Sequence, residues 1–378
     1  MSANRKHQTA LPARTSAALA AALWIFLAWL SSIVLHGEII LMALIWILAI
    51  ALMAYRVFVT GIISRWRSVF FIILAWAFVV QFKAKLIGLT GGAFISPEIQ
   101  EVPYCHIAIV SSFLNYAYQQ YLALMSGRYH AWSPLTWGAL WLLITLVLGQ
   151  AWCSWACFYG GLDTGFARLF RKAKLQWVAV PKIVRDLPAA ILVAMLLLSL
   201  ISFQPIFCLW ACPLKIGTGF LDPNTATRII QLIIFATIGI VFLIALPILT
   251  KKRAFCGLIC PFGAWQAFFG QINPYRVTIR PEACIQCKLC IKACPTFCIE
   301  EEGLKEHKVL PYCNRCGECM DVCATGAIDY TVGWRKPWSF SPCFARTLFL
   351  LSAWLVAGSV SLLFVPEVML KLWRSVSP

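Results

Sequence analysis

Long apolar runs alternate with short basic loops along most of this chain. A run of about 20 apolar residues is long enough to cross a bilayer as a helix. The pattern predicts about seven such helices, so the expected fold is an all-α polytopic membrane protein. The predicted spans are Ser16–Leu35, Ile39–Tyr55, Ser68–Phe82, Leu135–Trp152, Leu187–Phe203, Ile229–Leu249 and Arg346–Val365.

One polar segment interrupts the pattern between the last two spans. It contains the acidic stretch Glu300–Glu302 and no run long enough to span, so we expect a small soluble insert there. The predicted divisions are an N-terminal transmembrane region with an outer-side loop (1–133), a transmembrane region with three CxxxC motifs (134–272), the insert (273–340), and a C-terminal transmembrane helix with its tail (341–378). Within the outer-side loop, the amphipathic run Ile107–Met125 is expected to lie along the membrane interface.

The basic loops predict how the chain is oriented. Lys and Arg gather in the N-terminal tail and after the second, fourth and sixth predicted spans. By the positive-inside rule these loops face the cytoplasm of a bacterial inner membrane, and the C-terminus faces the outer side. The first apolar run, Ala17–Leu35, lacks an A-x-A cleavage pattern, so we interpret it as a retained helix; a signal peptide is the alternative.

Composition supports the membrane class. The chain has 378 residues, of which 61% are hydrophobic and 12% charged, which is too little charge for the surface of a soluble domain. The net charge of +17 would suggest nucleic-acid binding in a soluble protein. Here it is accounted for by loops beside apolar runs, so the expected partners are the lipid bilayer and not nucleic acid.

Seventeen cysteines change the picture from a membrane protein to a metalloprotein. Two runs repeat the spacing CxxCxxCxxxC, which is the signature of bacterial ferredoxins with two [4Fe–4S] clusters. In that arrangement the fourth cysteine of each run binds the other cluster. The predicted ligands are Cys284, Cys287, Cys290 and Cys323 for the first cluster, and Cys313, Cys316, Cys319 and Cys294 for the second. The insert is therefore expected to have the small α+β fold of such ferredoxins. Zinc ribbons or disulfides are the alternatives; the doubled order disfavours zinc, and the expected cytoplasmic location disfavours disulfides.

Three further cysteine pairs with CxxxC spacing follow the fourth, fifth and sixth predicted spans. They are Cys153 with Cys157, Cys208 with Cys212, and Cys256 with Cys260. The i, i+4 spacing places both thiols on one helix face, so two facing pairs can hold one cubane. The fourth and sixth spans end on the same side, which predicts a third [4Fe–4S] cluster on Cys153, Cys157, Cys256 and Cys260.

The remaining pair, Cys208 and Cys212, is predicted to lie on the opposite side. Cys105, with His106 as a possible fourth ligand, could complete a further centre there. The alternatives are that Cys208 and Cys212 pack as thiols or form a disulfide with each other or with Cys105.

These motifs together resemble the NapH/NosR-like membrane polyferredoxins. The resemblance rests on Cys256-GLI-Cys260-PFGAW, the related Cys208 motif and the two ferredoxin runs, and covers roughly the C-terminal half of the chain. It implies electron transfer between the quinone pool or cytoplasmic donors and periplasmic redox partners. The chain departs from the family pattern at Cys157, which is followed by Phe158 where Pro is usual, and in having three CxxxC motifs.

Electron transfer is therefore the predicted function, with cytoplasmic-side clusters connected to the quinone pool or to an outer-side redox partner. The sequence leaves open whether the chain is itself a quinol or quinone oxidoreductase subunit. One alternative is a maturation or regulatory factor that reduces the metal centre of another enzyme. Another is a transporter with structural clusters, but transporters carry polar residues inside their spans and the predicted spans hold few.

Overall fold

The computed structural model of the chain describes residues 10–88, 106–111, 113–127, 134–204, 206–214, 225–333 and 340–376. The first third forms α2 (Ala13–Val34), α3 (Ile39–Thr60), α4 (Ser64–Gly88), α5 (His106–Ser111) and α6 (Phe113–Met125). The middle forms α7 (Pro134–Leu148), α8 (Trp152–Trp155), α9 (Phe158–Ala167), α10 (Lys182–Ser202), α11 (Ala226–Thr237), α12 (Leu246–Thr250), α13 (Ala254–Leu258) and α14 (Pro261–Phe269). The last part forms β1 (Tyr275–Ile279), α15 (Leu289–Ala293), α16 (Glu301–Lys305), α17 (Glu318–Val322), β2 (Ile328–Val332), α18 (Pro342–Ser361) and α19 (Val365–Val376).

Six helices in the described ranges are long and apolar enough to cross a membrane. They are Ala13–Val34, Ile39–Thr60, Leu142–Ala167, Lys182–Ser202, Ala226–Thr250 and Pro342–Ser361. The mostly helical membrane class is therefore as predicted, whereas the sequence pattern suggested about seven spans. The predicted third span lies within α4, a continuous helix of 25 residues that is not among the six.

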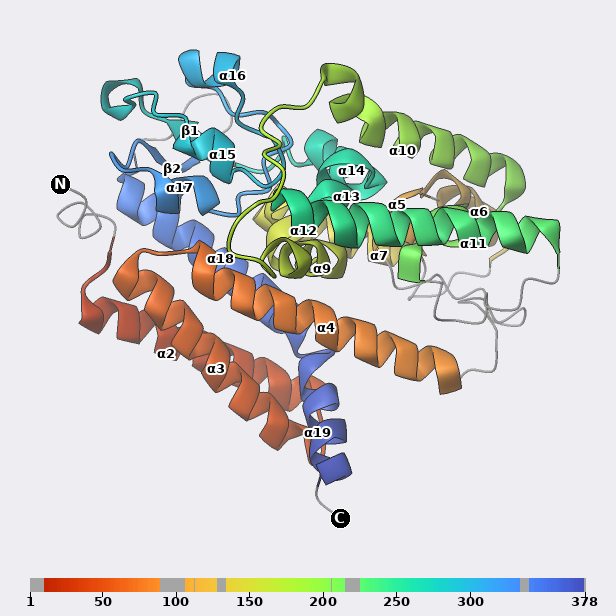
Figure 1. The fold of residues 1–378 in the computed structure, drawn as a ribbon. Helices are drawn as coiled ribbons and strands as arrows, with labels where there is room; N and C mark the ends of the chain where they lie inside the picture. The colour runs from red at the N-terminus through yellow and green to blue at the C-terminus, as the bar shows by residue number, and fades with distance from the viewer. Residues whose placement is uncertain are drawn as a thin grey trace.

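The helices pack as a bundle with the cysteine-rich segment at one end (Figure 1). Helices α2, α3, α4 and α18 pack on one another. The first described helix begins beside the cysteine-rich segment, whereas α19 and the C-terminus lie at the other end of α2 and α3 (Figure 1). There, Arg374 of α19 forms an ion pair with Glu38 in the α2–α3 turn at 2.7 Å.

The span Leu142–Ala167 is interrupted close to the cysteine-rich end. Helix α7 ends at Leu148, a 3₁₀ turn and α8 follow, and α9 begins only after Cys157. Helix α9 then runs antiparallel to α4, because Phe158 stacks on Phe78 of α4 with ring centroids 3.9 Å apart, while the far end of α9 returns to the start of α4. This half-helix after a CxxxC pair is a feature that the apolar pattern did not predict.

Two adjacent glycines let α9 approach α4 closely. A Cβ atom at Gly161 would lie 2.4 Å from the Cβ of Ala75 and 2.6 Å from the carbonyl oxygen of Phe71. A Cβ atom at Gly160 would lie 2.3 Å from the carbonyl oxygen of Cys153. Small residues at helix crossings permit this backbone contact inside membranes. The Gly160–Gly161 pair therefore fixes where the preceding CxxxC turn sits.

The run Ile107–Met125 forms α5 and most of α6. These helices pack against α7, α10 and α14, and their position along the membrane interface stays a prediction. In Figure 1 both are seen between α10 and α11.

The cysteine-rich segment is built on a two-stranded antiparallel sheet. Strands β1 and β2 pair from Tyr275 opposite Val332 to Ile279 opposite Ile328. Helices α15 and α17 pack against each other beside this sheet. The small α+β arrangement agrees with the predicted ferredoxin-type fold.

Candidate iron–sulfur sites

The two CxxCxxC loops have the same backbone conformation. In the first loop, Gln286 and Lys288 have positive φ angles of 51° and 60°. The equivalent positions of the second loop, Arg315 and Gly317, have φ angles of 53° and 82°. Left-handed residues are uncommon outside glycine, so their repetition at the same two positions is a specific feature. These turns curl each loop so that its cysteines face one cavity.

The cysteines line two separate cavities in the predicted crossed arrangement. One cavity is lined by Cys284, Cys287, Cys290 and Cys323. The other is lined by Cys294, Cys313, Cys316 and Cys319. The fourth cysteine of each run thus joins the other run's loop. Each of these fourth cysteines also accepts a hydrogen bond from the backbone N–H four residues later: Cys298 N donates to Cys294 Sγ at 3.1 Å, and Ala327 N donates to Cys323 Sγ at 3.3 Å.

Burial controls the charge of these sulfurs. It raises the pKa of the Cys290 and Cys316 thiols to about 11. Near neutral pH such thiols keep their protons unless a metal replaces them, because a coordinating cation deprotonates a thiol outright. Cys294 differs, since its hydrogen bonds with Cys298 lower its pKa. Among the described residues no three His, Cys, Asp or Glu side chains converge closely enough to hold a single metal ion; a cubane uses a wider ring of sulfurs.

Two of the CxxxC pairs line a third cavity at the junction with the bundle. Its walls include Cys153, Cys157, Cys256 and Cys260, the four residues that the sequence grouped together. Cys157 is the N-cap residue of α9, and Cys260 is the N-cap residue of α14. The positive ends of two helices therefore face this cavity, which favours negative charge there.

The third cavity adjoins the second. Thr296 and Asn314 line both of them. The Ser154 hydroxyl, one residue after Cys153, donates to the carbonyl oxygen of Asn314 at 2.6 Å. Asn314 therefore lines both cavities and also joins the CxxxC turn to the cysteine-rich segment.

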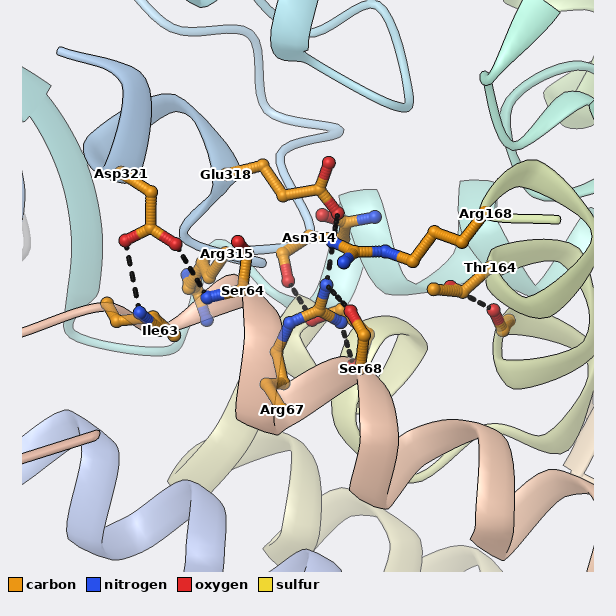
Figure 2. Close-up of polar contacts among 12 residues, drawn as sticks. Ile63, Ser64, Arg67, Ser68, Thr164, Arg168, Asn314, Arg315, Glu318 and Asp321 are labelled. Atoms are coloured by element: carbon orange, nitrogen blue, oxygen red, sulfur yellow. Dashed lines mark hydrogen bonds and ion pairs between the residues drawn. The ribbon is translucent and has the colours of Figure 1, made fainter. Parts of the chain in front are cut away.

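A polar network docks the cysteine-rich segment onto the bundle (Figure 2). The Glu318 carboxylate accepts from Arg67 of α4 and from Arg168 after α9, each at 3.1 Å. Arg67 also donates to the carbonyl oxygen of Ser154 at 2.6 Å. Asp321 accepts from the backbone N–H groups of Ile63 and Ser64, at 3.0 and 2.7 Å, and so caps the start of α4.

Two more contacts hold the same junction. The buried Lys252 ammonium donates to the carbonyl oxygens of Ile291, Lys292 and Cys294 at 3.3, 2.7 and 2.7 Å. Burial lowers the pKa of Lys252. Arg315 donates to the carbonyl oxygen of Leu148 at 2.9 Å. The cysteine-rich segment is therefore fixed to the ends of α7 and α12, and is not attached only by its chain connections.

The pair Cys208 and Cys212 lies closer to the third cavity than the sequence suggested. Both are buried, in and just after a π-helical turn, Phe207–Ala211. The Tyr159 hydroxyl lies 3.2 Å from Cys212 Sγ, and Tyr159 is only two residues from Cys157. The π-helical turn also contacts α5 and α11.

His106 lies beside Cys157, one of the cysteines of the third cavity. Its Nε2 lies 3.1 Å from Cys157 Sγ, although the sequence grouped His106 with Cys208 and Cys212 at the opposite side. Both contacts are thus made by the turn from Cys157 to Tyr159. Cys105, the third predicted ligand of the outer-side centre, lies outside the described residues.

Sequence reasoning missed several polar residues at the third cavity. The buried Asp163 carboxylate accepts from Cys256 N at 3.0 Å, and Asn314 and Arg253 are buried nearby. Asp163 sits in an apolar stretch, and an ionisable residue in such a stretch signals function. It was missed because it follows the predicted fourth span.

Comparisons with known proteins agree with this geometry. Residues 276–324 match the 4Fe-4S dicluster domain family. The 4Fe-4S binding domain family matches three times, over 130–175, 187–218 and 232–275. Each of these three segments contains one CxxxC pair, so all three pairs lie in matches to the same domain family. No solved structure matches the chain.

Three relatives illustrate the similarity. An uncharacterized protein of Methanocaldococcus jannaschii is 30% identical over 52% of this chain and 77% of its own length. YccM of Escherichia coli, a proposed electron transport protein, is 26% identical over 57% of this chain and 58% of its own length. The ferredoxin-type protein NapH of Haemophilus influenzae is 30% identical over 51% of this chain and 66% of its own length. The chain thus spans less than two thirds of YccM and about two thirds of NapH.

Proposed function

The chain belongs to the family of membrane-bound ferredoxin-type proteins that includes NapH, YccM and MauN, and from this premise we propose that it relays electrons between its dicluster domain and the quinone pool or an outer-side redox partner. The observation that carries the proposal is the contact between sites. The second dicluster cavity and the CxxxC cavity share Thr296 and Asn314 as walls. A cubane bound at each site would supply one-electron storage within a short distance of the next.

The dicluster cavity lined by Cys284 is the proposed meeting point with a cytoplasmic donor or acceptor. Cys287 is exposed there. Ile285 and Leu289, on either side of it, are 66% and 44% exposed although both are large and apolar. An exposed apolar rim around a redox site suits a transient protein contact. The basic loops support a cytoplasmic position for this face.

We propose a third [4Fe–4S] cluster on Cys153, Cys157, Cys256 and Cys260. The four thiols surround one cavity, and the N-termini of α9 and α14 favour the negative charge that four thiolates carry. Asp163 works against that charge, but its hydrogen bond from Cys256 N fixes the backbone of the second pair.

A further centre on Cys208 and Cys212, with Cys105, is the proposed continuation of the relay. The supporting observation is the short path from Cys157 along the backbone to Tyr159 and across its hydrogen-bond contact to Cys212. Burial of the pair inside the bundle shortens the distance that an electron must cross, because the hydrocarbon core is about 30 Å thick.

Iron and sulfide analysis of the purified protein tests the number of clusters. Four iron atoms per cubane predict about sixteen per chain for four centres, about twelve for three and about eight for the dicluster domain alone. We expect Cys260→Ser to remove about four. The matched control is Cys343→Ser, which changes a half-buried thiol of α18 outside the predicted ligand sets, and it should leave the count unchanged. A count of about eight in the unaltered protein would overturn the third and fourth sites.

Reduction by quinol tests the function itself. We expect a soluble ubiquinol analogue to bleach the visible absorption of the purified protein, and Cys208→Ser combined with Cys212→Ser to slow this step. Full iron content with no quinol reaction at any ratio would contradict the quinone part of the proposal.

A further inference from the structure

Arg253 is a buried cation between the dicluster segment and the CxxxC pair Cys256 and Cys260. It lies between α12 and α13 and is 1% exposed. Its backbone N–H donates to the carbonyl oxygen of Pro295 at 2.8 Å, directly after Cys294. Three residues further along the chain is Cys256. The backbone therefore holds Arg253 between a residue of the dicluster site and a residue of the CxxxC site.

The two terminal nitrogens of the Arg253 guanidinium lack hydrogen-bond partners among the described residues. Its neighbour Phe71 offers only a ring face, 5.7 Å from the guanidinium carbon to the ring centroid. A buried charge with no partner costs several kcal/mol, so the fold would retain this arrangement only if an anion occupied the space beside it.

The nearby carboxylates do not hydrogen-bond the terminal nitrogens of Arg253. Glu318 is already bound by Arg67 and Arg168. Asp163 uses one oxygen for Cys256 N, and its other oxygen has no partner among the described residues. Arg67 provides a useful contrast, because it is equally buried and lies over the same Phe71 ring but is paired with Glu318.

The remaining negative groups are the sulfurs of the two cysteine sites. Although burial lowers the pKa of Arg253, the charges of Cys316, Glu318 and Cys256 raise it by more, and the net result is above the ordinary value. Cys316 belongs to the second dicluster set and Cys256 to the third set. One guanidinium thus acts on both sites.

We propose that Arg253 is the positioning residue that couples these two sites electrostatically, because its buried, unpaired charge is balanced by the anionic clusters bound at Cys316 and Cys256. The inference rests on the proposed third cluster. A nearby positive charge stabilises an added electron, and hydrogen bonds to sulfur raise the reduction potential of an iron–sulfur centre. Arg253 therefore favours an electron on the second and third sites over the first dicluster site, which is lined by Cys284. It draws electrons toward the membrane.

Reduction potentials measured by electron paramagnetic resonance during a redox titration of the full-length protein test this. In Arg253→Met we expect the reduction potentials of the second and third sites to fall by about 59 mV for one electron. The distribution of the electron between these sites and the first dicluster site then changes about tenfold. The potential of the first dicluster site should stay the same. Arg253→Lys keeps the charge and should retain most of the effect. Arg168→Met removes a partly exposed charge from the same network and should change the partition less, because solvent screens it.

The iron content of the same samples distinguishes a loss of coupling from the loss of a cluster. Unchanged potentials in Arg253→Met with full iron would overturn the coupling, and so would an equal fall at every site. If Arg253→Met loses iron, the potentials of Arg253→Lys are decisive. Unchanged potentials at its second and third sites support the proposal. A fall in these potentials with full iron content overturns it. A count of about eight iron atoms in the unaltered protein refutes the clusters outside the dicluster domain. A fall in the potential of the second site would then still support the action of Arg253 on that site.

Discussion

Asp321 connects the cysteine-rich segment to the bundle through one carboxylate. It accepts from the backbone N–H groups of Ile63 and Ser64 at the start of α4 (Figure 2). Losing a helix N-cap costs about 1 kcal/mol. We expect Asp321→Ala to lower the free energy of unfolding by about that amount, measured by thermal denaturation in detergent with the clusters in place.

The matched control for this prediction is Glu306→Ala. Glu306 pairs only on the surface with Lys308, at 2.8 Å, where both side chains are well exposed. Surface pairs contribute little to stability, so no measurable change is expected. Equal losses from both substitutions would show that Asp321 acts through general charge and not as a cap.

The cysteine ligand sets could be grouped from sequence because their spacing is local. A CxxCxxC loop determines its own turns, as the repeated positive φ angles at Gln286 and Arg315 illustrate. Arg253 could not be found this way, because a basic residue after a span looks like part of an ordinary positive-inside loop. Its burial against Phe71 sets it apart from the half-buried Lys251, two residues before it.

Contact between α4 and α9 depends on Gly161. An added Cβ atom would lie 2.4 Å from Ala75, so the helices must separate or tilt. Overpacking costs about 1–3 kcal/mol. We expect Gly161→Ala to lower thermal stability accordingly and to release iron from the third site, because α9 carries Cys157 at its N-cap. Parallel melting and iron analysis would measure both effects.

Gly165→Ala is the control one turn along the same helix. Its added Cβ atom would meet only Ile72, at 3.7 and 3.8 Å, which is ordinary contact. The alanine should keep both stability and iron. If Gly165→Ala were as damaging as Gly161→Ala, helix propensity and not the close approach to α4 would be the explanation.

Helices were predicted well where they were long and apolar, and poorly where they were short. Helices α9 and α14 have ten and nine residues, which is too short to span. Each begins at a cysteine N-cap, and cysteine is not among the residues that usually signal a helix start. Half-helices of this kind become visible only when their packing partners are known.

The position of the two chain ends relative to the dicluster domain sets the topology of the whole molecule. The first described helix begins beside the dicluster domain, and α19 lies at the far end of the bundle (Figure 1). If the basic loops face the cytoplasm, α19 faces the periplasm. We expect green fluorescent protein to fluoresce at the N-terminus and stay dark at the C-terminus, because it folds poorly after export. Alkaline phosphatase should be active at the C-terminus.

The opposite pattern would invert the relay. A fluorescent C-terminal fusion and a dark N-terminal one would place the exposed Cys287 site in the periplasm, where a soluble periplasmic protein would be its partner. Fluorescence from both ends would instead require an even number of crossings, and α4 would then not span. The paired fusions therefore decide both the side of the dicluster domain and whether α4, with Arg67 at one end and Lys83 near the other, is the seventh crossing.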